Sequence, residues 1–300
     1  QTSLGTIQSP ASFMGAWSTG GNVITVRCGV GGAGDLNAGL AFGGFNAYCN
    51  YTCTEEYDGT SWSAGGSLIY GGEEAQGAGT QTAGLRMGGW VSGYVACTEE
   101  YNGSSWATGG AMASGKNMGN STGVQNAAIY NGGRNPSSLS STEEYNGSSW
   151  SSGGSNLIAH QNGGMGGSQN ASILSIGDNN IATEIYDGTT FSSTNNKPEG
   201  KSYTSKAGDY NAFQISAGNS PSAPAGSLTT LEWNGTTWVY GCNVNDIRQN
   251  GVGSGAQSSA FSAFGRNGSP YVTTTEEYTK NNIPPYTTCV WTSGAGMNTA

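Results

Sequence analysis

Hydrophobic and polar residues alternate over short stretches of this chain, and glycine-rich segments separate the stretches. Between Gln81 and Met87, for example, small or polar residues alternate with Ala83, Leu85 and Met87, and a Gly-Gly pair follows. Alternation over a few residues, bounded by glycine, is typical of half-buried β-strands. No run of helix-forming residues occurs at helical spacing, so we expect an all-β chain.

A short unit recurs six times and combines an acidic pair, an aromatic residue, an Asn-Gly or Asp-Gly turn and a second aromatic residue. It reads TEEYNGSSW at 98–106 and again at 142–150. The first aromatic residues of the six units are 44, 44, 41, 47 and 45 residues apart, and they are Tyr57, Tyr101, Tyr145, Tyr186, Trp233 and Tyr278. Periods of 40 to 50 residues are typical of propeller blades. The sequence therefore predicts a six-bladed β-propeller.

Each repeat is expected to supply four strands. In the second repeat these are 68–70, 81–87, 95–101 and 104–107, with Asn102-Gly103 as the turn between the last two. Asn-Gly between two β runs is a strong hairpin signal. The segment before each acidic pair is rich in small residues in its first half, which suits an inner strand near a crowded central axis.

The second aromatic residue of each unit is expected on the outer strand of a blade. These residues are Trp62, Trp106, Trp150, Phe191, Trp238 and Trp291. Trp17 is a seventh, because GAWSTGG around it matches SWSAGG around Trp62. We therefore divide the chain into an N-terminal segment, 1–21, and the propeller, 22–300. The segment is expected to dock on the last blade and close the ring. The alternative is that it pairs with a neighbouring subunit, because an unpaired strand edge accepts a further strand.

The order of a hydrophobic strand ending in Gly-Gly, a strand with tyrosine and a strand with tryptophan resembles the kelch repeat over about 22–296. The interval from Gly43-Gly44 to Tyr57 is longer than in kelch repeats, and the fourth and fifth copies lack a clean Gly-Gly pair. The TEEY-NG-SW unit also resembles the Gly/Ser/Thr-rich repeats of bacteriophage virion and tail proteins. These resemblances imply a kelch-like propeller of four-stranded blades in a virion or an extracellular assembly.

Composition narrows the possible partners. The chain of 300 residues has a formal net charge of −9, with ten Lys and Arg spread singly. No basic patch is present to neutralise a phosphate backbone, so we expect no nucleic-acid partner. No apolar stretch approaches the roughly 20 residues that span a bilayer, so we expect no membrane insertion. The 52 Gly are accompanied by eight Trp, 15 Tyr and seven Phe, which favours an ordered core over disorder.

The acidic pairs are the most suggestive candidates for chemistry. Neighbouring residues of a strand face opposite ways, so Glu55 and Glu56 cannot share a pocket. Glu55 shares a face with Tyr57, which indicates a repeated contact between blades or a solvated rim. The DGTSW unit lacks the spacing of the sialidase Asp box, and His160, the only histidine, is expected in a solvated loop. We therefore predict no enzyme activity, no cofactor and no metal site.

Six cysteines are present, at 28, 49, 53, 97, 242 and 289. Cys242 and Cys289 both fall in the last repeat. A disulfide between them is one interpretation, and buried free thiols are the other.

These observations predict a non-enzymatic structural or adhesion component of a virion or extracellular assembly. Its loops are expected to contact neighbouring subunits, of the same or another kind, or a host glycan or receptor. The repeats that differ most from the others carry the candidate contact loops, 195–205, 220–227 and 280–288. The alternative function is a carbohydrate-binding propeller lectin. A lectin predicts several similar exposed aromatic pockets, whereas an assembly component predicts buried tryptophans and one dominant subunit interface.

Overall fold

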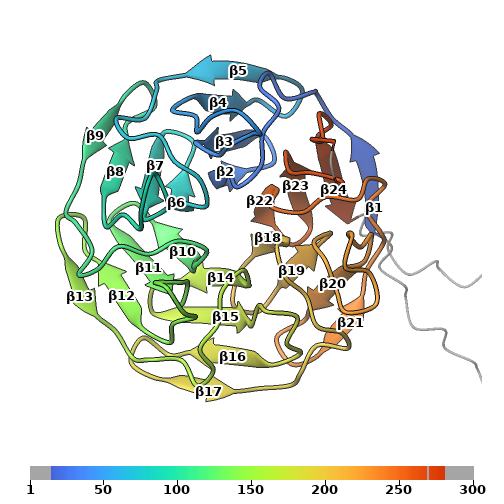
Figure 1. Cartoon of the computed structure of the whole chain (residues 1–300). Helices are drawn as coiled ribbons and strands as arrows, with labels where there is room; N and C mark the ends of the chain where they lie inside the picture. The colour runs from blue at the N-terminus through green and yellow to red at the C-terminus, as the bar shows by residue number, and fades with distance from the viewer. Residues whose placement is uncertain (1–14, 269, 281–300) are drawn as a thin grey trace, which may run out of the picture.

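The computed structural model describes residues 15–268 and 270–280, which form six four-stranded antiparallel sheets around one axis (Figure 1). The described residues contain no helix. The prediction of an all-β, six-bladed propeller with four-stranded blades is confirmed. The kelch-like and phage-like character of the repeats stays a prediction.

The blades follow one another around the axis in chain order. Blades one to three are β2 (Gly31–Asp35), β3 (Ala38–Phe42), β4 (Thr54–Tyr57) and β5 (Trp62–Gly65); β6 (Gln76–Thr80), β7 (Ala83–Met87), β8 (Thr98–Tyr101) and β9 (Trp106–Thr108); β10 (Asn120–Val124), β11 (Ala127–Asn131), β12 (Thr142–Tyr145) and β13 (Trp150–Ser152). Blades four to six are β14 (Gly164–Ser168), β15 (Ala171–Ser175), β16 (Thr183–Tyr186) and β17 (Phe191–Ser193); β18 (Ser205–Gly208), β19 (Phe213–Ser216), β20 (Thr230–Trp233) and β21 (Trp238–Tyr240); β22 (Val252–Ala256), β23 (Ser259–Ala263), β24 (Glu276–Lys280) and β1 (Gly15–Thr19).

The first strand of each blade lies nearest the axis, and its small residues allow close approach. A Cβ atom added to Gly77 in β6 would lie 2.3 Å from the carbonyl oxygen of Gly32 in β2. The inner strand and the second strand both come from the recurring small-residue segment, which the sequence analysis treated as one strand. The last two strands are joined by the predicted turn, in which Asp58 Oδ1 accepts from the N–H groups of Thr60 and Ser61 at 2.8 and 2.7 Å.

The predicted strand at 68–70 is wrong, because this segment is a loop and the inner strand of its blade begins at Gln76. The N–H groups of Ile69 and Tyr70 donate to the carboxylate of Glu99, at 2.7 and 3.2 Å. A backbone whose donors bind a side chain cannot also join a strand ladder, so this apolar segment stays outside the sheet.

The sixth blade takes its outer strand from the start of the chain. Strand β1 pairs antiparallel with β24, from Gly15 opposite Lys280 to Thr19 opposite Glu276. Trp17 lies opposite Tyr278, with ring centroids 5.0 Å apart. It thus occupies the position that the sequence analysis gave to Trp291, which lies outside the described residues. Figure 1 shows β1 along the rim beside β24.

Candidate functional site

The tyrosines of the repeated unit join each blade to the one before it. Tyr145 Oη donates to Glu100 Oε1 at 2.6 Å and accepts from the N–H of Gly110 at 3.3 Å. Equivalent pairs are Tyr57 with Glu277, Tyr101 with Glu56, Tyr186 with Glu144 and Tyr278 with Glu232. Burial, and then the hydrogen bond to Glu100, raises the pKa of Tyr145 to about 12. A repeated contact between blades therefore exists, but the second glutamate of each pair makes it.

One blade boundary lacks this pair, and both of its members are replaced together. Ile185 stands in the fourth blade where the others have the second glutamate, and Trp233 stands in the fifth where the others have tyrosine. The indole of Trp233 donates to the carbonyl oxygen of Tyr210 at 3.1 Å. This boundary thus lacks both the glutamate and the tyrosine, and no tyrosine hydroxyl is left there without its acceptor.

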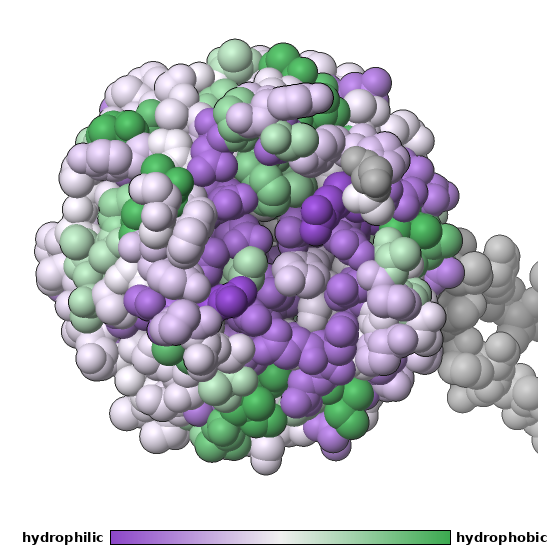
Figure 2. All heavy atoms as spheres, viewed as in Figure 1, coloured by the Kyte–Doolittle hydropathy of each residue, from purple (hydrophilic) through white to green (hydrophobic). Residues whose placement is uncertain are grey.

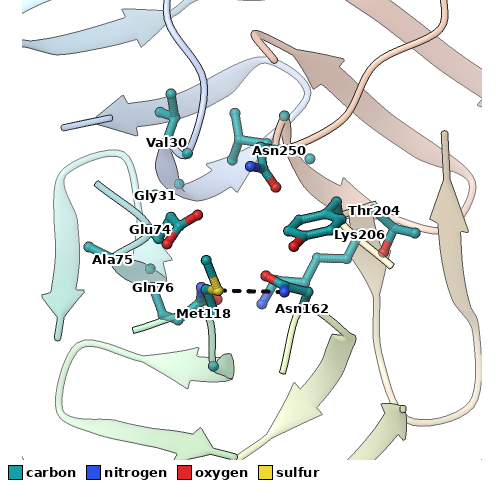
Figure 3. Close-up of a pocket in the computed structure, with 18 of the residues that line it drawn as sticks. Val30, Gly31, Glu74, Ala75, Gln76, Met118, Asn162, Thr204, Lys206 and Asn250 are labelled. Atoms are coloured by element: carbon teal, nitrogen blue, oxygen red, sulfur yellow. Dashed lines mark hydrogen bonds between the residues drawn. The ribbon is translucent and has the colours of Figure 1, made fainter. Parts of the chain in front are cut away.

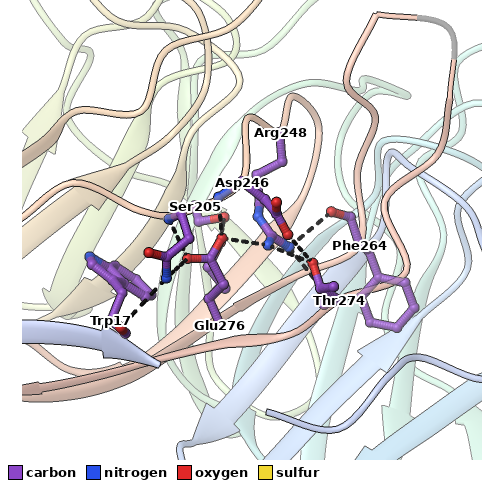
Figure 4. Close-up of polar contacts among 9 residues, drawn as sticks. Trp17, Ser205, Asp246, Arg248, Phe264, Thr274 and Glu276 are labelled. Atoms are coloured by element: carbon purple, nitrogen blue, oxygen red, sulfur yellow. Dashed lines mark hydrogen bonds and ion pairs between the residues drawn. The ribbon is translucent and has the colours of Figure 1, made fainter. Parts of the chain in front are cut away.

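The first glutamate of each pair fixes the loop that leads into its own blade. Glu184 accepts from the N–H groups of Leu157 and Ile158, at 2.9 and 3.2 Å. Burial raises the pKa of Glu184. In the sixth blade, Arg248 donates to the equivalent glutamate, Glu276, at 2.9 Å (Figure 4). The acidic pairs are therefore structural in both members.

The outer-strand aromatic residues are also used within the fold. Trp62 and Trp106 are 7% and 6% exposed, and each indole N–H donates to a threonine hydroxyl of the preceding blade. The pairs are Trp62 with Thr275, Trp106 with Thr54, Trp150 with Thr98 and Trp238 with Thr183, at 2.8 to 2.9 Å. Trp17 differs, since its indole donates to the carbonyl oxygen of Cys242 at 3.0 Å. The repeated aromatics therefore do not form a set of exposed pockets.

The expectation that His160 lies in a solvated loop is wrong. His160 is fully buried, and burial lowers its pKa to about 4. Its Nε2 lies 2.7 Å from Asn120 Nδ2, and its Nδ1 lies 2.9 Å from the carbonyl oxygen of Ile158. Both contacts fit a neutral ring in which Nδ1 carries the proton and donates to Ile158. The side chain therefore ties blade four to blade three.

The five described cysteines are free thiols. Burial raises the pKa of Cys28 to about 12, which keeps this thiol protonated and unreactive. Cys242 is half-buried behind Trp17, and its proposed partner Cys289 lies outside the described residues.

The two faces of the disc differ in the length of their connections. Short turns join the first two and the last two strands of a blade, as at 36–37 and 58–61 in blade one. The connections at the opposite ends of the strands are longer, as at 43–53 and 66–75. We call the surface formed by these long connections the loop face.

The loop face carries most of the exposed apolar side chains. Nine of the twelve large hydrophobic residues that are exposed among the described residues lie in these long connections: Ile24, Val26, Tyr48, Ile69, Tyr70, Val91, Leu157, Ile181 and Leu228. The other three are Val124 near the opposite face and Val239 and Tyr240 on the outer strand β21. Figure 2 shows hydrophobic patches distributed around a hydrophilic centre.

At the centre of the loop face, a ring of six backbone hydrogen bonds closes around the axis. One residue per blade, two positions before the start of the inner strand, takes part: Gly29, Glu74, Met118, Asn162, Tyr203 and Asn250. Each N–H donates to the carbonyl oxygen of its counterpart in the preceding blade, at 2.8 to 3.3 Å. All six have φ between 54° and 64°. This left-handed conformation is unusual for residues with a side chain, and five of the six have one.

Two cavities lie along the axis, one at the level of this ring and one between the inner strands. The upper one, of about 80 Å³, is lined by Glu74, Met118, Asn162, Tyr203 and Lys206 (Figure 3). Burial raises the pKa of Glu74 to about 7, although Asn117 donates to its carboxylate at 2.8 Å. The lower cavity, of about 180 Å³, is lined by the inner strands, and Lys206 contributes to both cavities.

Neither the ring nor the cavities were predicted from the sequence. A signal was available for the ring, because its six positions recur with the blade period of 41 to 47 residues. Their chemical identity varies, however, and only the shared backbone conformation unites them. The signal for Lys206 was its charge, because most other blades have a small, uncharged residue at the equivalent position of the inner strand.

Among the described residues, no helix is long and apolar enough to cross a membrane. The same residues contain no group of three His, Cys, Asp or Glu side chains that could hold a metal ion. A scan against protein-family models and a search of curated proteins found no match to this chain.

Proposed function

We propose that this protein is a non-enzymatic structural or adhesion component of a virion or extracellular assembly, and that it binds its partner through the loop face. The observation that carries the proposal is the concentration of exposed apolar side chains on that face. Ile69 and Tyr70, for example, are 49% and 52% exposed. Exposed apolar groups that are concentrated on one face of a protein favour contact with another surface.

The contacts between blades support a presenting role. Tyr145 and its counterparts, together with the buried tryptophans, join each blade to its neighbour, so the disc holds its loops in fixed relative positions. Preorganised loops lose less conformational entropy on binding. The partner would be a neighbouring subunit, a host glycan or a receptor. The insertion at 220–227 lies in a long connection, between β19 and β20, as a contact loop should.

The resemblance of the TEEY-NG-SW units to the repeats of bacteriophage virion and tail proteins supports a location in a virion or an extracellular assembly. The lectin alternative is less well supported. Equivalent sugar sites would need repeated exposed aromatic side chains, whereas Tyr57 is fully buried and Trp62 is 7% exposed. A lectin with one site in the variable loops stays compatible with the loop face.

The test compares two pairs of side chains with similar chemistry and exposure. The full chain is measured for self-association by light scattering and for sugar binding on a glycan array. We expect at least one of these activities, and we expect Ile69→Ser with Tyr70→Ser to weaken it. The matched control, Val239→Ser with Tyr240→Ser on β21, removes side chains that are 47% and 59% exposed. Neither activity in the full chain, or equal loss in both variants, would contradict the proposal.

A further inference from the structure

Lys206 occupies an unusual place on the inner strand β18. The equivalent positions of the other blades hold Gly32, Gly77, Ser121, Met165 and Gly253. The lysine side chain reaches from blade five past blade four to blade three. Its Nζ donates to the carbonyl oxygen of Ser121 at 2.7 Å and lies 3.5 Å from the hydroxyl of the same residue.

The other nine lysines and arginines, all within the described residues, have their charge compensated or exposed. Six form ion pairs: Arg27 with Glu55, Arg86 with Glu99, Lys116 with Glu143, Lys201 with Glu199, Arg248 with Glu276 and Lys280 with Glu232. Arg134 and Arg266 are exposed. Lys197 is buried without a carboxylate, but it donates to three oxygens, of Ser175, Ile176 and Ala182.

Among the ten lysines and arginines, Lys206 is therefore the one whose charged group faces a cavity and has a single close acceptor. An ammonium group has three N–H donors, so part of its hydrogen-bonding capacity is left for a group inside the cavity. Burial lowers the pKa of Lys206 to about 7, because no acidic side chain offsets the loss of water around the amine.

The lining of the lower cavity carries one positive charge and no negative charge. No carboxylate lines it, and Lys206 is the only charged residue among the side chains and glycines that do. The side-chain hydroxyls of the lining donate to backbone carbonyl oxygens, so Lys206 Nζ is the one side-chain donor of the lining with hydrogens left for an anion. At about 180 Å³ the cavity has room for a small ion and water.

We propose that the lower axial cavity binds a small oxyanion, such as sulfate or phosphate, with Lys206 Nζ as its principal ligand. The anion would supply the negative charge that no carboxylate of the protein provides near Lys206. A charge-assisted hydrogen bond from Nζ is stronger than one to a neutral oxygen. The competing interpretation is a brace, in which Lys206 only ties blade five to Ser121 of blade three.

The first experiment is a sulfate titration of the full chain, with sodium chloride at matched ionic strength as the reference. The signals are the side-chain NMR resonance of Lys206 and the backbone amide of Ser121. The variant is Lys206→Met, which places in blade five the residue that blade four already carries at Met165. We expect saturable shifts with sulfate and binding about tenfold or more weaker in the variant, the loss of one charge-assisted hydrogen bond.

Equal shifts with sulfate and chloride, or an unchanged Ser121 response in the variant, would leave Lys206 as a brace and overturn the proposal. A second experiment does not depend on whether the variant folds. The unaltered chain is crystallised in the presence of selenate, whose selenium gives an anomalous signal. An anomalous peak within hydrogen-bonding distance of Lys206 Nζ is expected, and a cavity without one would also overturn the proposal.

Discussion

Removing one hydroxyl from the boundary between blades two and three should cost a measurable part of the stability. Tyr145→Phe deletes the donor to Glu100 Oε1, which lies 2.6 Å away, and the acceptor for the N–H of Gly110. A hydrogen bond to a charged group contributes about 1.5–3 kcal/mol. Because Glu100 is only half-buried, we expect a loss at the low end, about 1–2 kcal/mol.

The assay is urea unfolding at pH 7, followed by tryptophan fluorescence. The ring of Trp150 lies 4.9 Å from that of Tyr145, so the probe reports on the boundary itself. Glu100→Gln and the double variant complete a cycle that isolates the pair from the effects of either change alone. Tyr70→Phe is the control, because this exposed tyrosine belongs to no such pair, and it should change stability by less than about 0.5 kcal/mol. A coupling energy below about 0.3 kcal/mol would refute the role of the Tyr-Glu pairs in joining the blades.

Three further predictions concern the axis, the buried histidine and the tyrosines. Gly77→Ala should destabilise the fold by about 2 kcal/mol or more in urea unfolding, because its Cβ would meet backbone atoms, whereas Gly93→Ala, with no atom within 4 Å of the added Cβ, should be nearly neutral. Stability should fall as the pH drops from 6.5 toward 4, because the unfolded chain binds a proton at this histidine in that range, whereas folded His160, with its pKa lowered to about 4, stays neutral. The free energy of unfolding should decrease by about 3 kcal/mol over this range, and the decrease should be smaller in His160→Gln. Stability should also fall as the pH rises from 10 toward 12, because burial raises the pKa values of Tyr57, Tyr101, Tyr145 and Tyr186 to about 12 and the unfolded chain loses those protons first; a urea midpoint that stays constant up to pH 11 would contradict this.

The blade architecture could be predicted because its determinants are local and repeated. The Asn102-Gly103 turn, the spacing of the aromatic residues and the small residues near the axis each depend on a few neighbours in the chain. The same local reasoning failed at 68–70, where an apolar segment satisfies its backbone through Glu99, 30 residues away. It also failed at His160, since a polar surrounding sequence does not reveal that another blade covers the side chain.

The candidate site depends on relations between blades that a single repeat does not contain. The ring through Glu74 and Tyr203 is defined by backbone conformation, and it is closed by a hydrogen bond between Gly29 and Asn250, at opposite ends of the chain of blades. The uncompensated charge of Lys206 becomes visible only when the surroundings of every other lysine and arginine are known. The position of Trp17 in the sixth blade required a choice between two similar segments, and local sequence does not make that choice.

The central claim is that a single chain closes its own ring and so holds the loop face as one disc. The most direct test is a cross-link between β1 and β24, at Ala16 and Thr279, which lie opposite each other and are both exposed. In Ala16→Cys with Thr279→Cys, mild oxidation should join the two introduced thiols within one chain of about 30.5 kDa, seen on a non-reducing gel and by peptide mass spectrometry. Covalent dimers and longer ladders through the same two positions would show instead that β1 completes the blade of a neighbour.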